Sequence, residues 1–385
     1  MTIREDWSIL QQELSPATGQ STFTRNNLLL PQDPILSGKG GDYASYEEIL
    51  RDDQVASTFQ QRRLAVTSSE WGVTPGADDK ESRKAADFLT ETLNRLSWDS
   101  ITDRMLYGLF YGYAIAECLW SRQNNQVILH DIKVRRQRRF GFNKLGTLIL
   151  LDTSGQSGQE MPAQKFWHFR NGVDHDDDPY GMGLAHWLYW PVQFKRNSLK
   201  LWLIYLDKFG MPTAKGTYPA HATEEEKRKL LQAMRAIQTD SGIILPEGMQ
   251  VELLEASRGG QVTYDLLLDR MNSAIAKVVL SQSMTTDASG GQYKADVHKQ
   301  VRNEVVKADA DLICDSFNRS VVRWLCAWNF PKAIPPNVWR RVTDEPDLRS
   351  LAERDHILYN MGFQPTLDYI RQTYGGQWEN RQSSS

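Results

Sequence analysis

Between Thr263 and Asn329 the hydrophobic positions predict two helices separated by a polar loop. The stretch from Ser281 to Gly291 interrupts the helical pattern with small and hydroxyl residues and a single charge, Asp287. Beyond the loop, apolar or small residues recur at steps of three or four, at Val297, Val301, Val305, Ala308, Leu312 and Ser316. At 1.5 Å per residue the second helix would be about 50 Å long. A flexible loop beside so long a helix indicates part of an assembly rather than a catalytic pocket.

The segment Ala185 to Phe209 has almost no polar face in its second half. Pro191 fits the first turn of a helix or a kink in one, and a glycine and a proline follow Phe209. A helix that is apolar all round must be buried on all sides, which packing between copies of the chain would satisfy. Lys195, Arg196 and further charges argue against a membrane span.

Residues 210–262 are predicted to form a small inserted unit between these helices. Thr223 and Glu226 have the spacing of a capping box that opens a helix. Two strands are predicted after it, at 242–246 and 251–254, joined as a hairpin through Glu247-Gly248.

The remaining pattern predicts a mixed body with less regular ends. Helices are expected at 46–66 and 85–96 and strands at 71–75, 147–151 and 165–169, while Tyr107 to Trp120 fits a helix end that turns into a buried strand. Residues 1–45 are polar, with prolines and glycines, and are expected to form an arm with little to bury by itself. A linker with three prolines is expected at 331–342, then mostly helix at 348–374 and a polar tail from Gly376.

Composition excludes several classes of protein. The 385 residues are 40% hydrophobic and 24% charged with a net charge of −3, as in an ordinary soluble protein, so any DNA contact would be local. The three cysteines form no CxxC pair and are expected to be buried free thiols in a reducing compartment. The first residues lack the apolar core of a signal peptide. A phosphate-binding GxxxxGK[ST] loop is absent from the sequence, which argues against an ATP-driven motor.

Two charged segments are candidates for chemistry. The basic stretch 133–144 includes Arg135, Arg136, Arg138 and Arg139 beside aromatic residues, and it could contact DNA, a neighbouring acidic subunit or only solvent. Glu117, in the apolar stretch, could be a general base, but pairing with an arginine is the interpretation we adopt. The segment 171–180 gathers Asp174, His175, Asp176, Asp177 and Asp178, which offer metal ligands but lack the pattern of a calcium loop. A solvated acidic loop is the preferred interpretation.

Four motifs resemble the Mu-like family of phage portal proteins. The most specific is MTTDASGGQYKADVHKQVRNEVVKADA at 284–310. Asp52-Asp53, Arg63 and a Trp-x-Val-x-Pro strand resemble the start of the family's body, and a YG…E..W pattern ends at Trp120. Gly181-Met182-Gly183-Leu184 resembles the family's YG.GL junction.

The resemblance implies an α+β portal fold. Its parts would be an N-terminal arm at 1–45, a wing at 46–185, a first stem helix at 186–209, a clip at 210–262, a second stem helix at 263–282, a channel loop at 283–295, a long helix of the wing at 296–330 and a short crown and tail at 331–385.

The resemblance also implies a function without catalysis, metal or other cofactor. Twelve subunits would form a ring at one capsid vertex of the virion, assembled in the host cytoplasm, which serves as the conduit for packaging and ejection of double-stranded DNA. The ring would contact the large terminase, head-tail adaptors and the major capsid protein, and no membrane. The channel loop would comprise Ser283, Met284, Thr285, Thr286, Asp287, Ser289, Gly290, Gly291 and Gln292, and the channel lining Lys195, Arg196, Lys200, Arg270 and Lys277.

Two other classes of function stay open at the level of sequence. A metal-dependent nuclease or DNA-binding protein would use Asp174, His175 and Asp176 as ligands and the 133–144 patch to hold the DNA backbone. A scaffold or adaptor would bind only other proteins. Formation of a large closed ring distinguishes the portal from both.

Overall fold

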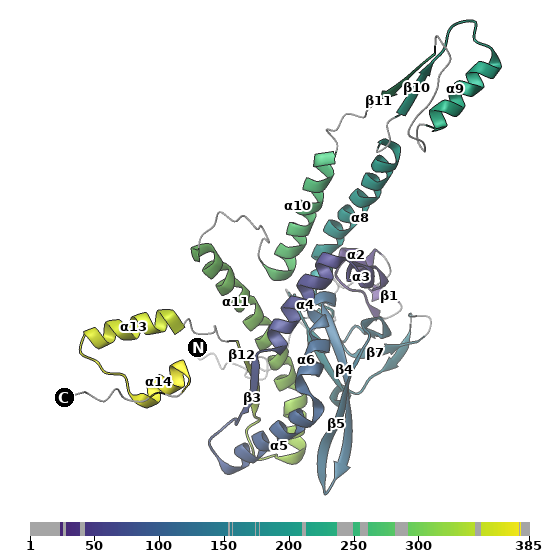
Figure 1. Cartoon of the computed structure of the whole chain (residues 1–385). Helices are drawn as coiled ribbons and strands as arrows, with labels where there is room; N and C mark the ends of the chain where they lie inside the picture. Colours follow the sequence, from purple (N-terminus) through teal and green to yellow (C-terminus); the bar gives the residue numbers. More distant parts are fainter. Residues whose placement is uncertain are drawn as a thin grey trace, which may run out of the picture.

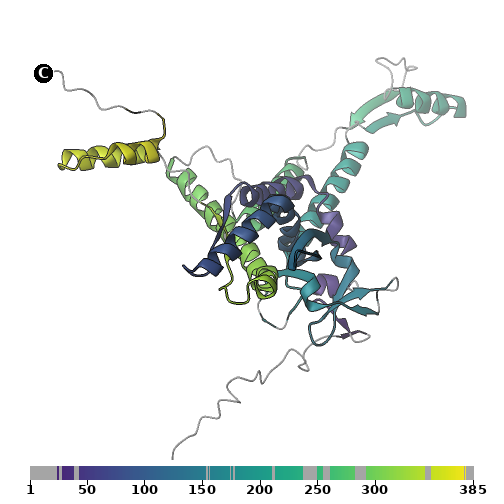
Figure 2. The same cartoon turned by 90° about the horizontal axis from the view of Figure 1, so that it is seen from below.

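A mixed helical and stranded body carries a long helical hairpin with a small unit at its tip (Figure 1). The computed structural model describes residues 24–25, 28–38, 43–152, 155, 157–173, 175–176, 178–209, 213–236, 249–254, 261–281, 292–342, 348–376 and 378. Seen from below, the tip unit and the C-terminal helices extend to opposite sides of the body (Figure 2). The predicted α+β class is confirmed.

The strands of the body form small antiparallel sheets. The central one has the order β5-β4-β9, and the others in the body are β6-β7-β8 and the two-stranded pairs β3-β12 and β1-β2. Their bounds are β3 Glu70–Thr74, β4 Tyr113–Gln123, β5 Gln126–Arg135, β6 Phe140–Phe142, β7 Leu148–Leu151, β8 Gly158–Glu160, β9 Phe166–Arg170 and β12 Asn337–Arg341. The strands predicted at 71–75, 147–151 and 165–169 are confirmed within one residue at either end.

Aspartate caps set where two helices of the body, α4 and α5, begin. The Asp52 side chain accepts hydrogen bonds from the backbone N–H groups of Gln54 and Val55, so the predicted helix 46–66 is two helices. Asp79 caps the next helix, which therefore starts five residues before the predicted Ala85. The helices are α3 Ala44–Ile49, α4 Asp53–Thr67, α5 Lys80–Leu96, α6 Trp98–Met105 and α7 Tyr107–Tyr111.

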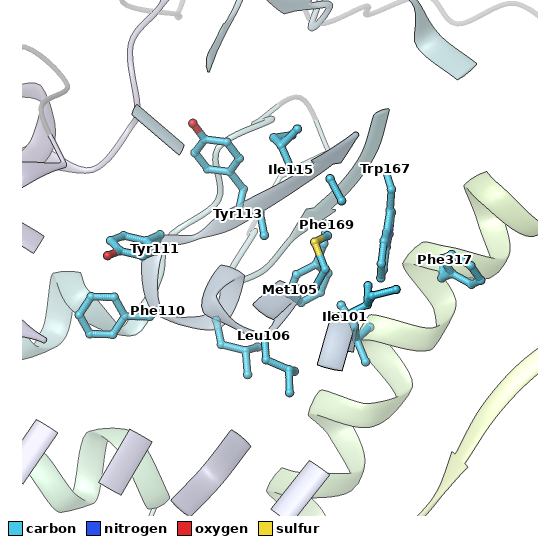
Figure 3. Packing of buried hydrophobic residues seen from close by; sticks show 14 of the residues in the cluster. Ile101, Met105, Leu106, Phe110, Tyr111, Tyr113, Ile115, Trp167, Phe169 and Phe317 are labelled. Carbon is cyan, nitrogen blue, oxygen red and sulfur yellow. The ribbon is translucent and has the colours of Figure 1, made fainter. Parts of the chain in front are cut away.

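Three aromatic side chains join distant parts of the chain in the core. Trp98 of α6, Trp167 of β9 and Phe317 of α11 (Gln292–Phe317) are fully buried. The Phe317 ring centroid lies 4.5 Å from that of Trp98 and 4.9 Å from that of Trp167. The Trp167 indole N–H donates to the Ser316 hydroxyl at 3.0 Å. Figure 3 shows Trp167 and Phe317 facing each other between the sheet and the helix.

The predicted long helix is confirmed, and the stripe that indicated it is not the face that packs on the body. The chain stays helical from α11 through a π-helical turn, η4 (Asn318–Val322), into α12 (Arg323–Asn329). Ala308 and Leu312 of the predicted stripe are exposed. The buried face lies one or two residues further on, at Val306, Asp309, Ala310, Ile313, Cys314 and Phe317. Two apolar stripes run side by side on this helix, and local spacing does not say which one meets the body.

The ends of the chain differ from prediction in two places. The predicted linker 331–342 contains β12, whose residues pair with β3 from Asn337 opposite Thr74 to Arg341 opposite Glu70. The predicted arm contributes to the core in its described part, because Leu29 and Leu36 are buried there. These two residues belong to β2 and α2, and the elements of this part are β1 Thr24–Arg25, β2 Leu28–Leu29 and α2 Pro34–Ser37. The helical prediction for 348–374 is confirmed by α13 (Leu348–Asn360) and α14 (Leu367–Tyr374).

The packing of Phe317 predicts a large effect of its truncation. We expect Phe317→Ala to lower the free energy of unfolding by about 3–5 kcal/mol, because it opens a cavity beside two stacked tryptophans. Urea unfolding monitored by tryptophan fluorescence measures this. Leu312→Ala is the matched control on the exposed side of the same helix, and a loss as large as that of Phe317→Ala would contradict the assigned face.

Candidate functional site

Two antiparallel helices form the long hairpin that leaves the body. They are α8 (Leu184–Phe209) and α10 (Gln261–Leu280), and they lie side by side in Figure 1. The rings of Trp202 and Tyr264 stack across the pair with centroids 6.4 Å apart and planes 7° apart. Pro191 lies inside α8, near its start, and does not end the helix. The helices predicted at 186–209 and 263–282 are confirmed.

The tip unit consists of one two-stranded sheet and one helix. β11 (Gln250–Leu254) pairs with β10 (Thr213–Thr217), a strand that the sequence analysis missed. The other predicted strand, 242–246, lies outside the described residues. The capping box is confirmed, since the Glu226 carboxylate accepts the Thr223 backbone N–H at 2.8 Å and opens α9 (Glu224–Ala236).

One face of α8 carries large apolar side chains that the rest of the described chain leaves uncovered. Trp187, Trp190, Phe194, Leu201 and Ile204 are between 52% and 60% exposed. Their spacing of three, four, seven and three residues places them on one stripe of the helix. We call these five residues the α8 stripe. Exposed apolar stripes of this size mark surfaces that bind another protein.

Polar contacts hold the base of α8 in the body. The Lys195 ammonium lies 3.0 Å from the Asp52 carboxylate and also donates to Asp53. This hydrogen bond is the main cause that lowers the pKa of Asp53 below its ordinary value. The Arg196 guanidinium donates to the Glu48 carbonyl oxygen at 2.5 Å. Lys195 is buried in the subunit, so we exclude it from the proposed channel lining.

The other predicted lining residues are accessible. Lys200 on α8 and Arg270 and Lys277 on α10 are exposed to solvent. The predicted channel loop from Ser283 to Gly291 lies outside the described residues, and of Gln292 only the backbone at the start of α11 is described. The structure therefore places the helices on both sides of this loop.

A buried network at the start of α8 was missed by the sequence analysis. Asp33 is buried, and its carboxylate caps α2 and accepts a hydrogen bond from the Tyr46 hydroxyl. The His186 Nδ1 atom lies 2.9 Å from the same carboxylate. The Asp33-Pro34 pair was the available signal, because aspartate followed by proline is typical of a helix start.

The interpretation of Glu117 as the partner of an arginine is confirmed. The Arg135 Nη2 group donates to the Glu117 carboxylate at 2.7 Å, across neighbouring strands. Of the basic patch, Arg136, Arg138 and Arg139 remain exposed in the turn after β5. That turn includes a short 3₁₀ helix, η1 (Gln137–Arg139).

The acidic segment is organised by an arginine. The Arg170 Nη1 group donates to the carbonyl oxygens of Asp176 and Asp178 at 2.7 and 2.9 Å. The buried Asp178 carboxylate accepts the backbone N–H of Tyr180 at 2.9 Å. Asp174 and Asp177 lie outside the described residues. Among the residues that are described, no group of three His, Cys, Asp or Glu side chains is arranged to hold a metal ion.

Burial changes the acid–base behaviour of groups in the central sheet and in α11. It lowers the pKa of His168 to about 4, with Arg170 adding to the effect. It raises the pKa values of the Cys118 and Cys314 thiols to about 12. All three cysteines are free and buried, as expected from the sequence. Within the described part of the chain, no helix is long and apolar enough to cross a membrane.

A family model described as the portal protein of Mu bacteriophage matches residues 43–376. The chain belongs to this family of portal proteins. The portal protein of Escherichia phage Mu is 29% identical over 297 residues, which are 74% of this chain and 57% of that protein. The Mu-like prophage FluMu protein gp29 of Haemophilus influenzae is 27% identical over 351 residues, 86% of this chain and 66% of that protein. The chain thus spans less than two thirds of either curated relative.

Solved structures share the fold of this portal protein at low sequence identity. A chain from the neck of an empty gene transfer agent particle has a TM-score of 0.60 at 12% identity, covering 89% of this chain and 98% of its own. A chain from the neck of the native particle, computed with C12 symmetry, has a TM-score of 0.53 at 13% identity and covers 90% and 94%. Both matches cover about nine tenths of this chain, so they support the fold as a whole.

His168, which is partly buried, predicts a loss of stability in acid. Its folded pKa lies below the ordinary value of 6.5, so the unfolded chain takes up the proton first as the pH falls from 6.5 towards 4. We expect His168 to lower the free energy of unfolding by about 2–3 kcal/mol as the pH falls from 7 to 4.5. In His168→Phe this decrease should be absent, as measured by urea unfolding at both pH values. The exposed His130→Gln is the control, and an unchanged pH dependence in His168→Phe would contradict the assignment.

Proposed function

We propose that this portal protein is the subunit of a closed ring of twelve copies whose channel conducts double-stranded DNA into and out of a phage head. Membership of the portal family supports this, as does the shared fold with a particle neck computed with C12 symmetry. The ring would lie at the portal vertex of the virion and assemble in the host cytoplasm. The function needs no enzymatic step by this chain.

The α8 stripe is the observation that carries the proposal. A ring joins each subunit to the next through two different faces of the same chain. One face would be the α8 stripe, with its tryptophans and aliphatic residues. The other would be the outer side of α10, where Leu266 and Leu267 are exposed. Burying both sets between neighbours removes apolar area from water that a lone subunit leaves accessible.

The hairpins of twelve subunits would line the channel. Lys200, Arg270 and Lys277 are exposed on them, with Arg196 nearer the body. The residues Ser283 to Gln292 would project into the channel, where Gly290 and Gly291 give backbone freedom for sliding contact. A chain with a net charge of −3 is suited to a conduit, because each neutralised phosphate would strengthen adhesion to DNA.

The other parts of the chain would meet the partners of the ring. The tip unit lies at the far end of the hairpin (Figure 1) and would form the clip that docks the large terminase and later the head-tail adaptors. The terminase would supply ATP hydrolysis. The wing would face the major capsid protein. The exposed Arg136, Arg138 and Arg139 would contact DNA or a neighbouring subunit.

Substitutions in the α8 stripe test the ring. We expect the purified chain to form a species of twelve times 44.1 kDa with a central hole, and Trp190→Asp with Leu201→Asp to shift it to monomers. A carboxylate buried between subunits lacks a partner, so the protein concentration needed for assembly should rise at least tenfold. Native mass spectrometry and negative-stain images measure this.

Leu145→Asp is the control for this experiment. Leu145 is 73% exposed in the turn between β6 and β7, away from the hairpin. It should leave the ring intact. Equal loss of assembly in both variants, or a ring that survives Trp190→Asp with Leu201→Asp, would overturn the proposed interface.

A cleavage assay separates the conduit from the nuclease. We expect no cleavage of plasmid DNA with Mg²⁺ or Mn²⁺, because the Arg170 cation lies 3.4 Å from the Asp176 carboxylate and the Asp178 carboxylate accepts the Tyr180 backbone N–H. Gel electrophoresis after incubation measures this. Metal-dependent cleavage by the wild type that is lost in Asp176→Ala would refute a function without catalysis.

A further inference from the structure

One arginine of the body contacts both helices that flank the predicted channel loop. Arg62 of α4 donates from Nη1 to the carbonyl oxygen of Val279 in α10 at 2.6 Å. Its Nε and Nη2 groups donate to the two carboxylate oxygens of Asp309 in α11 at 2.6 and 2.8 Å. A single rigid guanidinium therefore joins three helices.

The geometry at Asp309 is that of a strong, buried ion pair. The side chains of Arg62 and Asp309 are 12% and 3% exposed. Two parallel N–H···O bonds fix the direction of the pair as well as its distance, which a lysine could not reproduce. Asp309 lies on the buried face of α11, between Val306 and Ile313, so the pair also fixes the rotation of that helix.

The third contact acts on the end of α10. Val279 is the last residue but one of the helix, and carbonyl groups in the final turn lack partners within the helix. A cation at this end is stabilised by the helix dipole. The next residue after the helix, Ser281, has a φ of +56°, a left-handed conformation that favours glycine and is rare for serine. Arg62 thus holds the chain at the point where it turns into the loop.

We propose that Arg62 is a positioning residue that holds the last turn of α10, which precedes the predicted channel loop, against α4 and α11. This rests on the proposed function, in which residues 283–292 contact DNA. The guanidinium binds the carbonyl group at the end of α10 and the buried face of α11, so the end of α10 keeps one position relative to α4 and α11. Loss of the contact leaves the Val279 carbonyl group without this donor, while the hydrophobic packing of Val279 and Leu280 in the core remains.

The neighbouring Arg63 is a matched control. It is also a largely buried arginine of α4, and it pairs with Asp103 of α6 and packs its guanidinium over the ring of Tyr107, 4.4 Å from the centroid. None of these contacts involves α10 or α11. Arg62→Lys and Arg63→Lys therefore make the same chemical change at adjacent positions of α4. The first removes contacts with α10 and α11, and the second removes a contact with α6.

Hydrogen–deuterium exchange of the full-length chain tests the proposal. We expect Arg62→Lys to raise the exchange rates of the amides at 276–281, which are the last turn of α10 and the residue after it, by at least tenfold. Arg63→Lys should leave these rates unchanged. Asp309→Asn keeps the bond to Val279 and should instead raise exchange along α11. Equal exchange at 276–281 in the two lysine variants would overturn the proposal.

The same samples separate this inference from the proposed function. Native mass spectrometry reports whether each variant forms the ring, and exchange reports the helix ends in either state. If the wild type forms no ring but the two lysine variants differ in exchange at 276–281, the ring is rejected and the positioning role of Arg62 stands. If both variants form the ring and do not differ in exchange, only the positioning role is rejected. If Arg62→Lys does not fold, Asp309→Asn is the test, because unchanged exchange along α11 would reject the positioning role.

Discussion

The contact of Phe317 with Trp98 and Trp167 is the constraint on which the remaining architecture depends. It fixes α11 across the central sheet, with the two tryptophans supplied by α6 and β9. Asp309 of α11 binds Arg62 of α4, and Arg62 binds the end of α10, so this packing is connected to the base of the hairpin. Aromatic side chains bury much area with few rotatable bonds, which suits a joint between elements far apart in sequence.

The hairpin divides polar and apolar contacts along its length. Near the body, α8 is held by ion pairs and hydrogen bonds at His186, Lys195 and Arg196. These contacts have defined directions and hold the helix at one angle. The α8 stripe runs along the same helix on the uncovered side. Apolar contacts are less directional, so this stripe can be buried by a neighbour without constraining the angle that the body has already set.

Several features could be predicted because they depend on nearby residues. The helices 184–209, 261–280 and 292–329 follow from apolar residues at helical spacing, and the capping box at Thr223 from two side chains three residues apart. The pairing of Glu117 followed from the cost of burying a lone carboxylate near arginines. The motifs at 284–310 and before Leu184 were sufficient to indicate the portal family, which the match over 43–376 then established.

The sequence by itself determined the two helices of the hairpin and the long helix after them, because each helical hydrogen bond joins residues only four apart. Tertiary structure decided which face of α11 is buried, since both of its apolar stripes have helical spacing. It also decided that Asn337–Arg341 is a strand, because the backbone groups of this segment pair with those of β3, which lies far earlier in the chain. Arg62 and Arg63 are adjacent and chemically identical, and only the packing of distant helices gives one of them Asp309 and the other Asp103.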